Sequence, residues 1–149
     1  KVEGPKLEQI RALVDAGIPV MGHVGFTPQS VHALSGYKVQ GRDEASATRI
    51  MAECLEIEKA GAFAIVLEMV PADLAAEITA ALTIPTIGIG AGKDCDGQIL
   101  VWTDFAGLDS RSPSFSKQYA NLRESLCQAA SSYVEEVEKS EFPSKDQSF

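Results

Sequence analysis

Short apolar segments alternate along this chain with segments of helical periodicity, and this alternation restricts the fold more than any other feature. The apolar segments, each rich in Ile, Val, Leu or Ala, span residues 18–22, 62–67, 84–89 and 98–102. Amphipathic helical patterns occupy residues 6–16, 44–60, 72–82 and 117–139. Continuous apolar strands separated by helices are typical of a parallel sheet that is buried on both faces. The sequence therefore predicts an α/β fold.

Polar residues stand where the predicted strands finish. His23 follows residues 18–22, and Glu68 follows residues 62–67. Lys1 and Glu3 lie at what looks like the end of an earlier strand. Ligands of parallel α/β proteins bind at the carboxyl ends of the strands, so we expect these side chains to form a site.

Each of these residues also has a structural alternative. Glu68 could cap the next helix or pair with a nearby lysine, and His23 could be a buried histidine that only satisfies hydrogen bonds. Lys1 and Glu3 could form a solvated chain end. The residues alone indicate an active site without naming its reaction.

Composition excludes several classes of protein. The chain has 149 residues, enough for one domain with a substantial core, and a net charge of −8 that argues against nucleic-acid binding. No apolar run approaches the roughly 20 residues that span a membrane. The three cysteines, Cys54, Cys95 and Cys127, are an odd number without CxxC spacing. They predict reduced thiols rather than a disulfide framework or a zinc site.

Four linked motifs resemble the ketopantoate hydroxymethyltransferase family. They read HVGFTPQS at residues 23–30, GYKVQGR at 36–42, VLEMVP at 66–71 and IPTIGIGAGKDCDGQILV at 84–101. The resemblance implies a (β/α)8 TIM barrel of the phosphoenolpyruvate/pyruvate type. It also implies hydroxymethyl transfer from 5,10-methylenetetrahydrofolate to 3-methyl-2-oxobutanoate, giving 2-dehydropantoate for pantothenate biosynthesis. Further implications are Mg²⁺, a homo-decamer, and a cytoplasmic location in bacteria or a mitochondrial one in eukaryotes.

The resemblance also assigns expected roles to the four polar residues. Glu68 matches the general base that removes a proton from C3 of the 2-oxo acid. Lys1 and His23 match residues that contact this substrate, and Glu3 matches a glutamate near the metal. The family's direct metal ligands are aspartates that would lie upstream of Lys1, so we expect no direct metal ligand in residues 1–149.

The same resemblance predicts how much of a barrel the chain covers. Residues 1–149 match the end of the fourth strand, strands five to eight and the C-terminal helix, as the C-terminal part of a single domain. We expect such a half barrel to be inactive alone. Two positions depart from the family pattern, Trp102 and Gln147. Alternative functions are another lyase of the same barrel superfamily and a non-catalytic half barrel that acts only in assembly.

Overall fold

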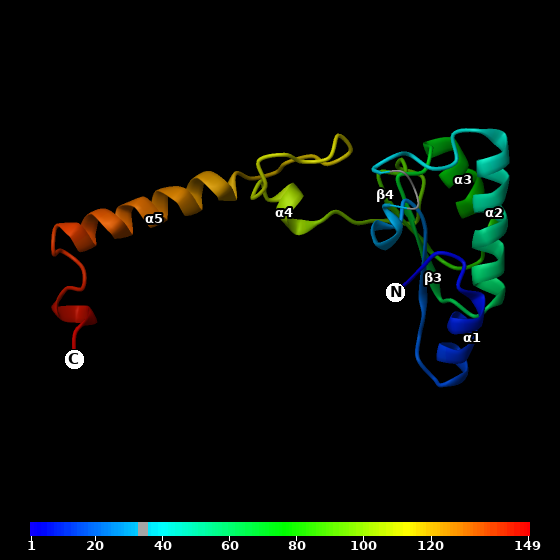
Figure 1. Cartoon of the computed structure of the whole chain (residues 1–149), viewed down its shortest axis with the longest axis horizontal. Helices are drawn as coiled ribbons and strands as arrows, with labels where there is room; N and C mark the ends of the chain where they lie inside the picture. Colours follow the sequence, from blue (N-terminus) through cyan, green and yellow to red (C-terminus); the bar gives the residue numbers. More distant parts are fainter. Residues whose placement is uncertain (33–35) are drawn as a thin grey trace. The chain divides into compact units, whose positions relative to one another are not determined.

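The computed structural model describes residues 1–32 and 36–149. The chain divides into two compact units, Lys1–Ile99 (unit 1) and Leu100–Phe149 (unit 2), which are described separately. Unit 1 contains, in chain order, β1 (Val2–Glu3), α1 (Leu7–Asp15), β2 (Met21–Gly25), the 3₁₀ turn η1 (Pro28–Ser30), α2 (Glu44–Lys59), β3 (Ala64–Glu68), α3 (Ala72–Ala81), β4 (Thr86–Ile89) and β5 (Gly97–Gln98) (Figure 1).

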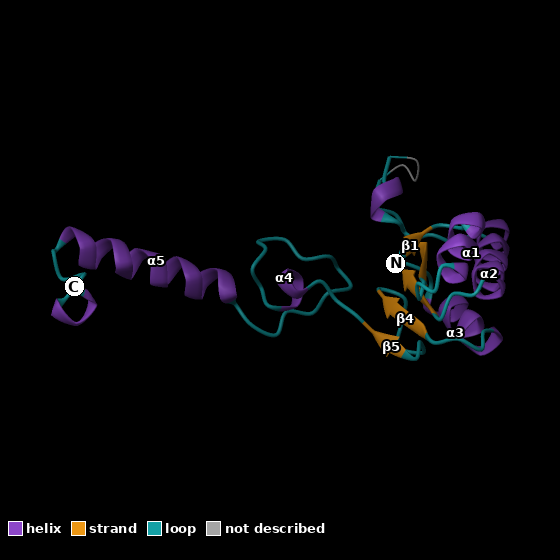
Figure 2. Ribbon diagram, turned by 90° about the horizontal axis from the view of Figure 1, so that it is seen from below, coloured by secondary structure: helices purple, strands orange, loops and turns teal. Residues whose placement is uncertain are grey.

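The five strands of unit 1 form one parallel sheet in the order β1-β2-β3-β4-β5. Helices α1, α2 and α3 lie on the same side of this sheet (Figure 2). A doubly wound sheet would instead reverse its strand order and carry helices on both faces. Sequential parallel strands with helices on one side are the arrangement of a (β/α) barrel, so the predicted barrel-type α/β fold is confirmed.

The core of unit 1 lies between the sheet and its helices. Ile65 and Leu67 of β3 are fully buried against a cluster that includes Ile57 of α2 and Ile78 of α3. Successive strand residues point to opposite faces. Glu68, like the residue two positions before it, therefore points to the face of the sheet that these helices do not cover.

The strands begin later than the apolar runs predict. Residues 18–22 and 84–89 were expected as strands, but β2 begins at Met21 and β4 at Thr86. Each run contains a proline, Pro19 or Pro85, which has no N–H to donate to the ladder. Strand β2 also extends beyond the expected end at residue 22 to Gly25, so His23 lies in the middle of β2 rather than after it.

The expected last strand, residues 98–102, is also corrected. Strand β5 covers only Gly97–Gln98, and Ile99 N donates to Gly88 O as the final ladder contact, at 3.0 Å. Trp102 begins helix α4 (Trp102–Phe105) instead of ending a strand. Its backbone carbonyl accepts the helical hydrogen bond from Ala106 N.

Unit 2 contains α4, α5 (Leu122–Glu138) and the 3₁₀ turn η2 (Lys145–Gln147). The helix expected over residues 117–139 begins later, because Tyr119 N and Leu122 N donate to carbonyls at the end of α4. Those bonds fix residues 119–121 outside the helix. Gln147 closes a capping box with Ser144, which gives this departure from the family pattern a local structural role.

No helix among the described residues is long and apolar enough to cross a membrane.

Candidate functional site

The four polar residues that the sequence singled out lie together: Glu3 and Glu68 end β1 and β3, His23 is in the middle of β2, and Lys1 precedes β1. Glu3 is in register with His23, and Glu68 is in register with Gly25, two residues further along β2. Parallel pairing therefore places one carboxylate on each side of His23. Lys1 reaches the same point from the residue before β1. The structure confirms that these residues are neighbours; their roles remain predictions.

His23 is the centre of this cluster and is almost completely buried, with 1% of its surface exposed. Its Nδ1 lies 2.6 Å from Lys1 Nζ. A charged lysine has only hydrogens to offer, so Nδ1 must accept this bond and the ring proton must sit on Nε2. Lys1 thus fixes the tautomer of His23.

The protonated nitrogen of His23 faces Glu68. Nε2 lies 2.9 Å from Glu68 Oε2, yet it makes no hydrogen bond within the described residues. The distance is short and the direction is poor, so the carboxylate oxygen lies off the N–H axis. The Glu68 side chain is 14% exposed, which leaves its oxygens accessible to a substrate.

Glu3 sits on the other side of His23. Its Oε1 lies 3.7 Å from both Lys1 Nζ and His23 Nδ1. Its Oε2 accepts a hydrogen bond of 3.0 Å from the backbone N–H of Gln29, in η1. The side chain is only 9% exposed, so its charge is compensated by Lys1 and by this N–H rather than by bulk water.

The backbone around Glu68 is held from two sides. Phe26 N donates to Glu68 O at 2.8 Å, and Gln40 N donates to Met69 O at 2.9 Å. Met69 has a positive φ of 50°, an uncommon conformation for a residue with a side chain. Gly25 has a φ of +87°, and a Cβ there would lie 2.2 Å from Glu68 O.

Sequence reasoning missed Gly25, Met69 and the backbone of Gln29 as parts of this site. Gly25 could have been recognised, because a glycine at the carboxyl end of a strand often permits close backbone approach. The positive φ of Met69 had no signal in the sequence. Neither did the N–H that Gln29 offers to Glu3.

No group of three or more His, Cys, Asp or Glu side chains is arranged to hold a metal ion in the part of the chain that the structure describes. Glu3 and Glu68 are oxygen donors of the kind that Mg²⁺ prefers. Both already face His23, however, and they do not converge on a common point with a third ligand. These side chains therefore do not fit a complete magnesium site.

A sequentially ordered parallel sheet with its helices on one side defines a barrel-type α/β protein, and Glu3 and Glu68 lie at the carboxyl ends of two of its strands. The chain belongs to the ketopantoate hydroxymethyltransferase family, whose model matches residues 1–145.

Curated relatives support the same membership. The chain is 55% identical over its whole length to the 3-methyl-2-oxobutanoate hydroxymethyltransferase of Thermobifida fusca, covering 54% of that protein. It is 58% identical to the proteins of the same name from Nocardioides sp. and Acidothermus cellulolyticus, covering 48% and 56% of their lengths. The chain thus spans about half the length of the curated relatives it matches.

Proposed function

We propose that the protein transfers a hydroxymethyl group to 3-methyl-2-oxobutanoate. In the balanced reaction, the 2-oxo acid, 5,10-methylenetetrahydrofolate and water give 2-dehydropantoate and tetrahydrofolate. The family and the names of the relatives support this reaction. The observation that carries the residue assignment is the 2.9 Å approach of Glu68 Oε2 to the buried His23 Nε2.

The first step is removal of the C3 proton of the 2-oxo acid by Glu68. The C–H bond beside a ketone is a weak acid, and a positioned carboxylate is a suitable general base. The proton moves to a Glu68 oxygen, and the electron pair moves into the enolate. His23, held by Lys1 as the Nε2–H tautomer, places its protonated nitrogen 2.9 Å from the Glu68 carboxylate.

The second step is formation of the new carbon–carbon bond. Water adds to the methylene bridge and both of its C–N bonds break, which leaves tetrahydrofolate and formaldehyde. The enolate carbon C3 attacks the carbonyl carbon of formaldehyde, and the new alkoxide takes the proton that Glu68 holds. Lys1 supplies positive charge at the mouth of the site, where its side chain is 43% exposed. This placement suits a contact with the substrate carboxylate. Glu3, neutralised by Lys1, holds that ammonium group in position.

The remaining features of the proposal rest on the family resemblance. Mg²⁺ would supply Lewis-acid stabilisation of the enolate when bound, with aspartates expected upstream of Lys1 as direct ligands and Glu3 nearby. A homo-decamer and a cytoplasmic location complete the proposal. The relatives named above are bacterial, which favours the cytoplasm over mitochondria.

The direct test is a product assay on the natural protein that contains this chain. With 3-methyl-2-oxobutanoate, 5,10-methylenetetrahydrofolate and Mg²⁺, we expect 2-dehydropantoate by mass spectrometry. Glu68→Gln should reduce its formation by about 10²-fold or more. Cleavage of the 2-oxo acid instead of its extension would indicate a lyase of the same barrel class. No turnover by a folded protein would support the assembly role.

A further inference from the structure

Two residues other than glycine have a positive φ in the part of the chain that the structure describes, Met69 at 50° and Ser140 at 58°. A side chain makes this left-handed conformation unfavourable, so each case needs a structural reason. Ser140 follows the C-terminus of α5. The backbone N–H groups of Ser140 and Glu141 donate to carbonyl groups in the last turn of α5, the usual hydrogen-bond pattern of a helix end. Met69 has no such reason, because it directly follows the strand β3.

The conformation of Met69 is instead fixed by hydrogen bonds to other elements of unit 1. Its N–H donates to Ile89 O, at the end of β4, at 2.9 Å. Its carbonyl accepts from Gln40 N, also at 2.9 Å. The carbonyl before it, Glu68 O, accepts from Phe26 N at 2.8 Å. Both polar atoms of the peptide group that joins Glu68 to Met69 are therefore held, one from the β2 side and one from the β4 side.

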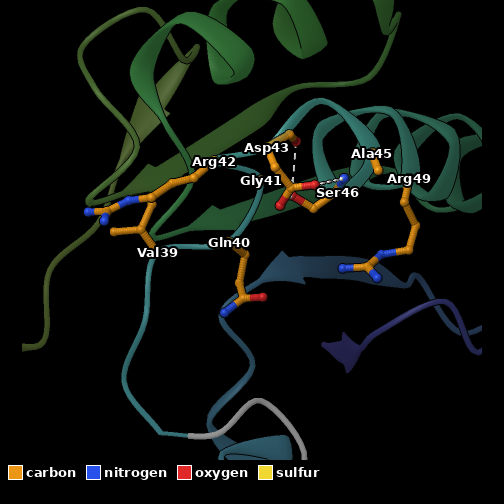
Figure 3. A pocket seen from close by; sticks show the side chains of 8 residues that line it. All are labelled: Val39, Gln40, Gly41, Arg42, Asp43, Ala45, Ser46 and Arg49. Carbon is orange, nitrogen blue, oxygen red and sulfur yellow. Dashed lines mark hydrogen bonds between the residues drawn. The ribbon is translucent and has the colours of Figure 1, made fainter.

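Gln40 can hold the Met69 carbonyl because the segment around Gln40 is anchored to two helices. Gln40 and Gly41 lie in the segment that leads into α2 (Figure 3). A Cβ at Gly41 would lie 2.7 Å from Leu74 Cδ2, so this backbone packs closely against α3. The side chain of Asp43, two residues further on, caps the N-terminus of α2. The N–H that Met69 O accepts is thus held by both α2 and α3.

A residue with a side chain is confined more narrowly in this conformation than glycine would be. The left-handed region that such a residue can adopt spans only about 20° in φ, whereas glycine also adopts a wide range of other positive φ values. The Cβ of Met69 therefore limits how far the peptide group before it can turn. The Cα of Glu68 belongs to that planar group, so the point from which the Glu68 side chain starts is limited as well. Strain of this kind persists only where the surroundings enforce it, and it concentrates at functional sites.

We propose that Met69 is a positioning residue for the reaction, and that its left-handed backbone keeps the Glu68 carboxylate in one position relative to the carbon that loses its proton. This inference rests on the proposed function, which makes Glu68 the base. A base must lie within hydrogen-bond reach of the proton it removes, and a misplacement of about 1 Å can slow a reaction by about 10²-fold. Met69 acts through the conformation of its backbone and not through a contact with the substrate.

The test compares residues at position 69 by the rate of C3 proton exchange of 3-methyl-2-oxobutanoate in D₂O, with the natural protein and Mg²⁺ and without folate. Met69→Gly removes the Cβ and should slow exchange by about tenfold. Met69→Ala removes only the atoms beyond the Cβ, and Met69→Asn introduces a residue that favours the left-handed region. Both should keep about half of the wild-type rate or more, because a Cβ still confines φ. Ser140→Gly, which makes the same backbone change in unit 2, is the matched control and should exchange as the wild type does.

Two further measurements separate positioning from stability. Glycine removes the strain at positive φ but adds freedom to the unfolded chain, and these opposing effects should leave the urea midpoint of Met69→Gly near that of the wild type. In the complete reaction, Met69→Gly should lower kcat with little change in KM for the 2-oxo acid, because the groups that bind this substrate are unaltered. A fall in the midpoint that accompanies the loss of rate would indicate a structural role only and would overturn the proposal.

Glu68→Gln, measured in the same exchange assay, separates this inference from the proposed function. Slow exchange in Glu68→Gln with wild-type exchange in Met69→Gly would overturn the positioning role and leave the base in place. Equally slow exchange in Met69→Gly, Met69→Ala and Met69→Asn would assign the effect to the Met69 side chain and would also overturn the positioning role. Wild-type exchange in Glu68→Gln, or no exchange by the wild type, would contradict both proposals.

Discussion

His23 has two different neighbours on its two ring nitrogens, and this asymmetry determines what it can do. Lys1 Nζ donates to Nδ1 at 2.6 Å, whereas Nε2 faces the Glu68 carboxylate at 2.9 Å. The histidine is buried, so water cannot replace Lys1 without rearrangement. Its tautomer is therefore set by Lys1, and this tautomer carries its proton on the nitrogen that faces Glu68.

Lys1→Met should release this control. With no donor at Nδ1, we expect His23 to change from the Nε2–H form to a mixture of tautomers. The ¹⁵N chemical shifts of the imidazole report this directly. Lys6→Met, which removes an exposed lysine at the start of α1, is the control and should leave the shifts unchanged. A single Nε2–H form in Lys1→Met would contradict the account.

Gly25 is needed for close contact between β2 and β3, and this predicts a difference between two glycine substitutions. Gly17 and Gly25 both have positive φ, +79° and +87°, but a Cβ at Gly17 would meet nothing within 4 Å. Gly17→Ala should cost about 1 kcal/mol of unfolding free energy from its backbone alone. Gly25→Ala should cost about 1–3 kcal/mol more from overpacking. Equal midpoints in urea denaturation would count against this role.

At the scale of elements, Thr86 connects three parts of unit 1. It is fully buried in β4, and its Oγ1 lies 2.8 Å from Thr79 Oγ1 of α3. Its backbone N–H and hydroxyl both donate to Asp96 Oδ2, in the turn before β5. One hydroxyl thus fixes the helix, the strand and the turn relative to each other.

Thr86→Val keeps the shape and removes these hydroxyl contacts. We expect the free energy of unfolding to fall by about 1–3 kcal/mol, because buried polar partners lose their hydrogen bonds. Thr48→Val, on the exposed surface of α2, should change it by less than about 0.5 kcal/mol. Chemical denaturation of the two variants checks this difference, and equal losses would contradict the role given to Thr86.

The same contacts predict how stability depends on acid. Backbone and side-chain hydrogen bonds from Thr86 lower the pKa of Asp96 in the folded protein. A carboxyl group with a depressed folded pKa stabilises the fold above its unfolded pKa and loses this effect as pH falls through the folded value. Thr86→Val retains the backbone bond only, so its stability should fall less steeply between neutral pH and strong acid. An unchanged slope in acid denaturation would argue against it.

The sequence predicted most elements of unit 1 and the grouping of the four site residues, but not their detailed geometry. Apolar periodicity reports burial and therefore identified α2 within one residue of its observed end. Apolar periodicity could not predict that Pro19 delays the start of β2, because the hydrogen-bond ladder of the sheet depends on backbone N–H groups and not on hydrophobicity. The contact between Lys1 and His23 was also out of reach, since it depends on register between two strands.

At the scale of the whole molecule, the reactivity of the three cysteine thiols tests how the chain is packed. Burial, with a contribution from Glu53, raises the pKa of Cys54 to about 12. At pH 8 roughly one Cys54 in ten thousand would be a thiolate. Cys127 is exposed on α5, and Cys95 is half-buried. We expect an aromatic disulfide reagent to modify Cys127 first, Cys95 more slowly and Cys54 only on unfolding.

The matched variant for this experiment is Cys127→Ser, which should remove the fastest phase and leave the others. Peptide mapping after a short exposure would identify the modified thiol. Rapid modification of Cys54 in the native protein would mean that α2 does not pack against the sheet as described.

The central claim is that Glu68 is the base that removes the C3 proton of 3-methyl-2-oxobutanoate. The most direct test of this claim is proton NMR of that substrate in D₂O with the natural protein and Mg²⁺, without folate. We predict loss of the C3–H signal, slowed by about 10²-fold or more in Glu68→Gln and unchanged in Glu77→Gln, an exposed control on α3. Exchange at the wild-type rate in folded Glu68→Gln would contradict the account.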